Sequence, residues 1–402
     1  MQGNLLVLAS GMAISTLAYN IVTPYKSPYF LLLGGGEVLL GIFLALPQFL
    51  NLLVVLPGGY FADMIGRKRI LVSMTLLSAL AFFIFSGSPS WLFLFIPQTL
   101  IAIANLSRPA RDAILADSMP KNQRSTGFAI VYALSGIGWT FGPLIGGYLY
   151  DSEGIWGIRV SFLFSAIGVL ITGVIYRVFL KETLFNHASQ VNTKSQKNFS
   201  LSTTMRRFFI QMRIAISQMD IPAKRFFIGY MFHWATRAII SAYWPLLLLL
   251  TMGFSGVEFG FIELAAGLAL IAFSIPMGKF SDRIGRPRAA FLILLAHALV
   301  LVWVVNSHLF IEVLLIGSLL DILDPLPSIH GLRADVIPKE SRGRVISLLS
   351  VAGYATSTIS VFVGGLLYTI GPQLPFYLIA AFWVISGVFF YKSKRNTSEF
   401  GK

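Results

Sequence analysis

Twelve long apolar runs dominate this sequence of 402 residues and constrain its fold more than any other feature. Each run has the roughly 20 mainly apolar residues that a helix needs to cross a bilayer, and a helix satisfies its own backbone hydrogen bonds within lipid. The runs cover residues 4–32, 36–60, 69–88, 91–117, 123–150, 156–180, 223–251, 256–279, 287–306, 309–336, 342–369 and 373–392. The first run has no charged leader and no small-residue cleavage site, so we expect a span there. The sequence predicts an all-α membrane protein with twelve transmembrane helices.

The composition favours the same fold and indicates whether the partner is a membrane or nucleic acid. Charged residues make up 12% of the chain and hydrophobic ones 56%, whereas soluble chains carry roughly twice that charged fraction. The net charge of +14 would suit nucleic acid, but the basic residues form short clusters between apolar runs, as membrane topology requires. We therefore expect a lipid bilayer as partner and no nucleic acid. The chain has no cysteine and five scattered histidines, so we predict no metal site and no cofactor.

The basic residues also predict the orientation. If the N-terminus is inside, 24 Lys and Arg residues fall in cytoplasmic segments and two, Lys26 and Arg159, fall outside. Positive charge is retained on the cytoplasmic side of membrane proteins. We predict a multi-pass protein of the cell membrane with both termini in the cytoplasm.

The chain repeats itself at a spacing of 218 to 219 residues. Residues 57–67 share seven of eleven positions with residues 276–286, and the pattern Ala-Asp-x-x-Pro-Lys-x-x-Arg occurs at both 116–124 and 334–342. Six predicted spans separate corresponding points, so the two halves have the same orientation, a plan that places a transporter's ligand site between the halves. The sequence predicts two pseudo-symmetric six-helix bundles, 1–180 and 223–402. The linker at 181–222 carries either an amphipathic interfacial helix near 203–219 or a loose basic tether.

The segments that begin these repeats resemble a known family. Residues 59–69 resemble the signature of the major facilitator superfamily between spans two and three, and residues 278–288 resemble its second copy. The match extends over essentially the whole chain and implies the major facilitator fold, alternating access and a breakable cytoplasmic latch. The implied latch residues are Gly59, Asp63, Gly66, Arg67, Gly278, Asp282, Gly285 and Arg286.

The resemblance also implies a charge relay near the inner gate, in which an arginine of span four works with Asp63 and Asp117. We assign this role to Arg111, because Asp117 follows it by about a turn and a half. The predicted relay comprises Arg111, Asp117, Arg124, Asp335 and Arg342.

Span five is similar to the family's antiporter motif, G-x-x-x-G-P-x-x-G-G, which is associated with drug–proton exchangers. Three of its glycines recur one helical turn apart and predict close packing against a neighbouring helix, and its proline predicts a bend. The motif residues are Gly138, Gly142, Pro143, Gly146 and Gly147.

Ionisable residues at membrane depth are candidate functional groups. Arg237 lies near the middle of span seven with His233 one turn away, and Asp321 and Asp324 lie three residues apart in span ten. That spacing places both carboxylates on one helical face. Because an unpaired Arg237 would be costly, we expect it to pair with Asp321 or Asp324, with Glu263 as the rival partner.

This cluster has two interpretations, a proton-coupling site or a structural ion pair. Pro325 and Pro327 follow Asp324 and predict that span ten is kinked or unwound there. In the other cavity-lining spans that the resemblance implies, we select Tyr19 and Asn20 of span one, and Arg108 with Asp112 of span four.

The sequence favours a monomeric secondary transporter that exports a small organic or amphipathic substrate in exchange for protons. The alternatives are a symporter or facilitator for uptake and a transporter-like sensor without net transport. The sequence has no P-loop and no G-x-S-x-G elbow. We therefore predict that ATP does not drive transport and that the protein is not an enzyme.

Overall fold

A computed structural model describes residues 2–119, 124–184, 210, 212–214, 216–217, 219–337 and 342–394. This part of the chain is helical, which confirms the predicted fold class. The helices of the first half are α1 (Gln2–Val22), α2 (Lys26–Leu32), α3 (Glu37–Ile65), α4 (Arg67–Ser86), α5 (Phe95–Ala104), α6 (Arg108–Asp117), α7 (Arg124–Glu153) and α8 (Ile155–Phe179). Those of the second half are α10 (Ile221–Leu246), α11 (Gly256–Ile284), α12 (Arg286–Val305), α13 (Phe310–Ile322), α14 (Leu326–Val336), α15 (Arg342–Ile370) and α16 (Leu374–Lys392).

Among the described residues, eleven helical segments are long and apolar enough to cross a membrane. The tenth predicted span is the exception, because it is divided into α13 and α14. Prolines at 325 and 327 explain the break: proline lacks a backbone N–H and is tolerated in the first turn of a new helix. Asp324 stabilises this start, since its Oδ1 accepts a hydrogen bond from the Leu326 backbone N–H at 3.0 Å. The predicted interruption of span ten is present.

Two other spans also contain breaks or 3₁₀ turns. The first span breaks between α1 and α2, around Pro24. The fourth begins with a 3₁₀ turn at Trp91–Leu94 and tightens again at Asn105–Ser107, just before Pro109 in the first turn of α6. These irregular turns set the direction of the side chains that follow them.

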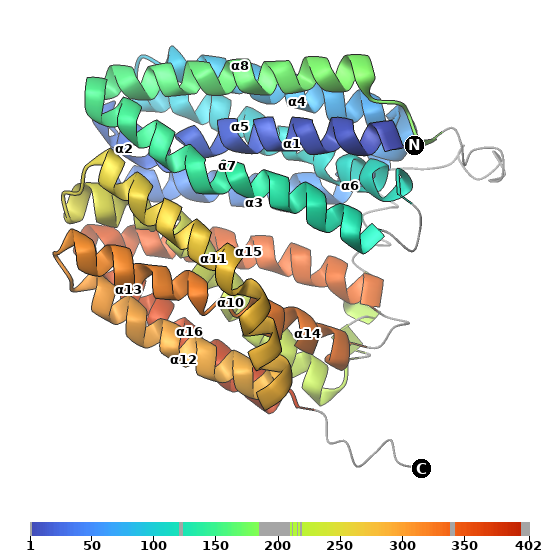
Figure 1. Cartoon of the computed structure of the whole chain (residues 1–402), viewed down its shortest axis with the longest axis vertical. Helices are drawn as coiled ribbons and strands as arrows, with labels where there is room; N and C mark the ends of the chain where they lie inside the picture. The colour runs from blue at the N-terminus through green and yellow to red at the C-terminus, as the bar shows by residue number, and fades with distance from the viewer. Residues whose placement is uncertain are drawn as a thin grey trace. The chain divides into compact units, whose positions relative to one another are not determined.

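The chain folds into two compact units. The first contains residues 1–198 and 248–267, and the second contains residues 199–247 and 268–402. In the first, α1 packs against α7 and α8, and α4 packs against α8 (Figure 1). In the second, α10 packs against α15 and α16, and α12 packs against α16. Corresponding helices therefore have corresponding partners, which gives the sequence repeat a structural counterpart inside each unit. The predicted division at 1–180 and 223–402 stays a prediction.

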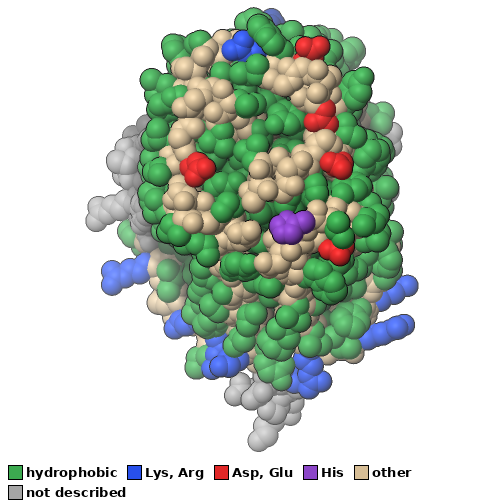
Figure 2. Space-filling model, turned by 90° about the vertical axis from the view of Figure 1, so that its left-hand side faces the viewer, with side chains coloured by type: hydrophobic (Ala, Val, Ile, Leu, Met, Phe, Trp, Pro, Cys, Tyr) green, Lys and Arg blue, Asp and Glu red, His purple; other side chains and the backbone are tan. Residues whose placement is uncertain are grey.

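Large apolar side chains are exposed on the outer surfaces of the long helices. On α8, for example, Phe164, Leu170 and Val174 are about half exposed. Figure 2 faces the end of the helices, where acidic side chains and one histidine lie among the hydrophobic ones. Exposed apolar surface on this scale fits helices that face lipid. Most of the predicted linker at 181–222, and most of its amphipathic helix near 203–219, lie outside the described residues.

Candidate functional site

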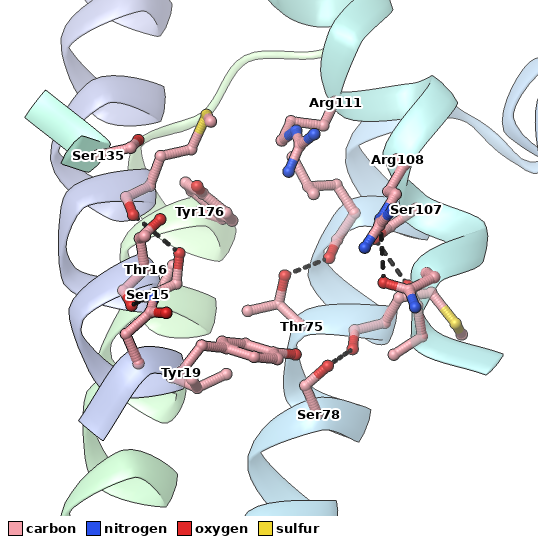
Figure 3. A pocket seen from close by; sticks show the side chains of 18 of the residues that line it. Ser15, Thr16, Tyr19, Thr75, Ser78, Ser107, Arg108, Arg111, Ser135 and Tyr176 are labelled. Carbon is pink, nitrogen blue, oxygen red and sulfur yellow. Dashed lines mark hydrogen bonds between the residues drawn. The ribbon is translucent and has the colours of Figure 1, made fainter. Parts of the chain in front are cut away.

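A polar cavity of about 400 Å³ lies inside the first unit. It is lined by residues of α1, α4, α6, α7 and α8 and of the 3₁₀ turn before α6. Figure 3 shows Ser15, Thr16 and Tyr19 of α1 on one side and Arg108 and Arg111 of α6 on the other. Polar groups are costly within a membrane-spanning bundle, so a concentration of them around a cavity marks the candidate site.

The 3₁₀ turn at Asn105–Ser107 positions the two arginines. Pro109 follows at the start of α6, and Arg108 and Arg111, three residues apart, share the helix face that lines the cavity. Asn105 Oδ1 accepts a hydrogen bond from Arg108 Nε at 3.1 Å, and Asn105 Nδ2 donates to Asn51 Oδ1 at 2.9 Å. This chain of amides fixes the direction of the Arg108 side chain.

Hydroxyl groups make up most of the remaining polar lining. Thr75 and Ser78 come from α4, Ser135 from α7, and Thr172 and Tyr176 from α8. Sequence patterns selected Tyr19, Asn20 and Arg108 for this region but missed these hydroxyl residues. Each is a common residue in a membrane helix, and only the packing of five separate helices brings them to one cavity.

The glycines of the span-five motif lie against backbone atoms of α1. A Cβ atom built on Gly138 would lie 2.4 Å from the backbone nitrogen of Leu17, and one on Gly146 would lie 2.0 Å from the carbonyl oxygen of Ile21. A Cβ atom on Gly142 would lie 2.7 Å from the Asn20 Cβ and 2.9 Å from the Asn20 backbone carbonyl carbon. Any side chain at these positions would force the two backbones apart. Helix α7 continues through Pro143, and the predicted bend there stays a prediction.

The other side of α7 holds the start of α11, which belongs to the same unit. A Cβ atom on Gly147 would lie 2.0 Å from the Gly256 carbonyl oxygen. Asp151 accepts hydrogen bonds from the backbone N–H groups of Gly256 and Val257, at 2.6 and 2.8 Å. A carboxylate at a helix N-terminus satisfies otherwise unpaired donors. Residues of the motif therefore contact both α1 and the start of α11.

The predicted latch and relay residues form ion pairs that correspond between the two units. Arg67 donates a hydrogen bond to Asp117. At the corresponding place in the second unit, Arg286 Nη1 lies 2.7 and 2.9 Å from the two carboxylate oxygens of Asp335, and its Nε lies 3.2 Å from Asp282 Oδ1. Latch and relay residues are therefore parts of one network.

One predicted relay contact is wrong. Arg111 does not reach Asp117: its Nε and Nη2 each lie 3.1 Å from Oδ1 of the adjacent Asp112. Asp117 instead pairs with Arg67, because the end of α6 lies beside the start of α4, while Arg111 faces the cavity. The side chains of Asp63, Arg124 and Arg342 lie outside what the structure describes.

A half-buried carboxylate that sequence patterns missed supports the turn between α3 and α4. Glu182 Oε2 accepts a hydrogen bond from the Lys68 backbone N–H at 3.0 Å and lies 3.0 Å from where a Cβ on Gly66 would be. Gly66 has a φ of +108°, a conformation that side chains strongly disfavour. The corresponding Gly285 has a φ of +90°, so both glycines are required by the backbone of the turn.

The predicted pairing of Arg237 is not formed with either aspartate. Within the described part of the second unit, no ion pair joins Arg237 to Asp321 or Asp324. The assumption of a shared helical face is also wrong, because α13 ends at Ile322 and Asp324 lies in the break before α14. Asp324 instead accepts a hydrogen bond from the Leu326 backbone N–H at the start of α14, and Arg237 is exposed. Glu263, the rival partner, belongs to the first unit and Arg237 to the second.

Apolar spans around a polar cavity, with ion pairs repeated in each half, are typical of membrane transporters. The model of the Major Facilitator Superfamily matches residues 8–217 and 226–401. The chain belongs to this superfamily, which confirms the resemblance. It is therefore a multi-pass membrane transporter and not an enzyme.

Individual relatives match over different lengths. The Na(+), Li(+), K(+)/H(+) antiporter of Planococcus maritimus is 34% identical over 173 residues, which are 42% of this chain and 40% of that protein. Multidrug resistance protein 2 of Bacillus subtilis (strain 168) is 23% identical over 407 residues, which cover 97% of this chain and 96% of that one. The crystal structure of a POT family transporter in complex with 5-aminolevulinic acid superposes with a TM-score of 0.74 at 15% identity, covering 97% of this chain and 96% of that one. This last similarity shows the shared fold.

Proposed function

We propose that this protein is a secondary active transporter that works by alternating access and exports a small organic compound in exchange for protons. The observation that carries the proposal is the polar cavity of about 400 Å³ within the first unit. Its size suits a small organic molecule, and polar groups in a membrane-spanning bundle serve a solute or an ion path more often than packing.

Two further observations favour exchange with protons over uptake. The span-five motif is complete, and its glycines pack directly on α1, the helix that supplies Ser15, Thr16 and Tyr19 to the cavity. Relatives that match this chain are named as antiporters or drug-resistance proteins. A movement of α1 against α7 would therefore change the cavity and the contact at the antiporter motif together.

The direct test is proton movement in liposomes that contain the purified protein. A pH gradient is imposed, a pH-sensitive dye is enclosed, and candidate compounds are added one at a time. Tetracycline, a quinolone, Na⁺ and K⁺ are suitable first candidates because related proteins are named for them. Antiport predicts that a substrate dissipates the gradient as it moves against the protons. Movement of substrate and protons in the same direction would support the symport alternative, and binding without flux would support the sensor.

Asp321 and Asp324 provide the coupling test. We expect Asp324→Asn to abolish proton-driven flux while leaving the protein folded, because an asparagine side-chain oxygen accepts a hydrogen bond from the backbone N–H two residues on as an aspartate does, which keeps the hydrogen bond to Leu326. Asp321→Asn should weaken coupling as well. Glu312→Gln, at the opposite end of α13, is the matched control and should keep its coupling. Unchanged coupling in both aspartate variants would rule out this assignment.

We also propose that both termini lie in the cytoplasm of a cell whose plasma membrane holds the protein. The 24 to 2 distribution of Lys and Arg supports this orientation. The chain has no cysteine, so single cysteines report topology without background. A cysteine replacing Ser90 should react with an impermeant maleimide in intact cells, and one replacing the exposed Lys394 should react only after the cells are opened. The reverse pattern would invert the topology.

A further inference from the structure

We propose that the cavity of the first unit binds a small organic anion that also carries hydrogen-bond donors, such as a hydroxylated or amino-bearing carboxylate. The inference rests on the proposed function, because it names the substrate class of the same site. Three features of the lining support it: its positive charge, the unused N–H donors of Arg111 and the orientation of its hydroxyl groups.

The charge of the lining is positive. Arg108 and Arg111 both line the cavity, and none of the described lining residues is acidic. Asp112, the ion partner of Arg111, has a side chain that is 49% exposed to solvent and does not line the cavity. It neutralises one of the two arginines at most. A cationic solute would meet this positive wall and few compensating groups, whereas an anion would gain from it.

The Arg111 guanidinium has donors to spare. Its Nε and Nη2 share one oxygen of Asp112, and among the described residues this is its only ion partner. A planar guanidinium presents five N–H donors and binds a carboxylate or phosphate through two parallel hydrogen bonds. Nη1 of Arg111 therefore remains for a ligand. Arg108, held by Asn105 at 3.1 Å, adds its charge from the same face of α6.

The hydroxyl groups add a second requirement. Thr75 donates to the Leu71 carbonyl at 2.7 Å, Ser135 donates to the Val131 carbonyl at 2.9 Å, and Thr172 donates to the Gly168 carbonyl at 3.0 Å. Each hydroxyl has one hydrogen and two lone pairs. Because the hydrogen is directed to the helix backbone, the lone pairs are what these groups offer to a ligand. A ligand with its own O–H or N–H groups satisfies them.

These two requirements separate the proposed ligand from the ions named for one relative of this chain. A monovalent metal cation needs several oxygen ligands and no adjacent positive charge. The cavity offers oxygens but places two guanidinium groups beside them. It is also far larger than a bare ion needs. The lining fits an anionic head group at Arg108 and Arg111 and donor groups directed toward α1, α4 and α8.

The experiment measures binding by calorimetry with the purified full-length protein in nanodiscs. Four probes share one aromatic ring: 4-hydroxybenzoate, benzoate, 4-hydroxybenzamide and 4-hydroxybenzylammonium. We expect 4-hydroxybenzoate to bind most tightly, about tenfold tighter than the neutral amide, because a charged hydrogen-bonded pair is lost in the amide. Benzoate should bind about threefold to tenfold more weakly, because it lacks the donor.

Variants locate the binding. Arg108→Gln and Arg111→Gln should each weaken 4-hydroxybenzoate binding by about tenfold and reduce the preference for the carboxylate over the amide. Arg177→Gln is the matched control: it removes the same charge from α8 of the same unit, at an exposed position that does not line the cavity, and should bind as the unmodified protein does. The ranking of the four probes on the unmodified protein remains informative if a variant fails to fold.

Several outcomes would overturn the inference. They are equal binding of the amide and the carboxylate, tightest binding of the cationic probe, or unchanged affinity in both arginine variants. The result is also separable from the proposed function. Export of a cationic drug without anion binding would contradict this inference alone. Anion binding without any proton-coupled flux would contradict the transport proposal alone.

Discussion

Replacing Gly146 by valine is expected to abolish transport and to destabilise the protein by about 3 kcal/mol. A Cβ atom at this position would lie 2.0 Å from the carbonyl oxygen of Ile21 and 2.6 Å from the Tyr25 ring. The nearest atom belongs to the backbone of α1, which cannot rotate away as a flexible side chain would. Relief requires α1 and α7 to separate, and these two helices carry much of the packing of the first unit. Thermal unfolding in detergent and flux in liposomes measure the two effects.

The same helix offers a matched control. Gly136 also lies in α7, but a Cβ atom built on it would meet no atom within 4 Å. Gly136→Val should therefore unfold at the same temperature as the unmodified protein, or slightly above it, because glycine is the poorer helix former. Equal loss of stability in the two variants would mean that the effect comes from helix propensity and not from the contact with α1.

The second large effect is expected at the ion pairs that join latch and relay residues. Asp117→Asn should cost about 2 kcal/mol and slow transport by about tenfold, whereas Asp335→Asn should cost under about 1 kcal/mol. The reason is burial. The side chains of Arg67 and Asp117 are 17% and 21% exposed, while those of Arg286 and Asp335 are 36% and 52% exposed. Removing the Asp117 carboxylate from the less exposed Arg67 therefore costs more than removing the Asp335 carboxylate from the more solvated Arg286.

Chemical unfolding of the two variants, measured side by side, gives the comparison. The exchange of charges, Arg67→Asp with Asp117→Arg, tests whether the pair itself matters, and we expect it to recover part of the loss that Asp117→Asn causes. Similar losses at Asp117 and Asp335 would contradict the role of burial. If the charge-exchanged double variant is no more stable than the Asp117→Asn variant, then residue identity, and not opposite charge, is required.

Sequence patterns predicted the features that depend on residues close together in the chain. Span limits follow from local hydropathy, and the break before α14 follows from Pro325 and Pro327, whose effect on a helix is local. The 218-residue repeat predicted that Arg67 and Arg286 occupy corresponding places. These three predictions depend on one segment alone or on a comparison of two segments. None of them depends on how the helices pack against one another.

Features that depend on which helices meet were predicted less well. Arg111 was assigned to Asp117 by its spacing along one helix, but α4 brings Arg67 to that carboxylate instead. Asp321 and Asp324 were placed on one face, but the break between α13 and α14 separates them. Spacing rules hold only while a helix is continuous and only for partners on that helix. Partners from other helices compete, and the sequence does not rank them.

The sequence by itself determined that this chain is a helical membrane protein with an internal repeat, because hydropathy, proline positions and glycine spacing act locally on the backbone. Only the tertiary structure decided that hydroxyl groups of α1, α4, α7 and α8 converge on the two arginines of α6. The lining residues are scattered from Met12 to Tyr176, and sequence patterns selected only a few of them, such as Tyr19 and Arg108. Their common environment arises from close packing that the small residues of α7 permit, and that packing is a property of the folded bundle.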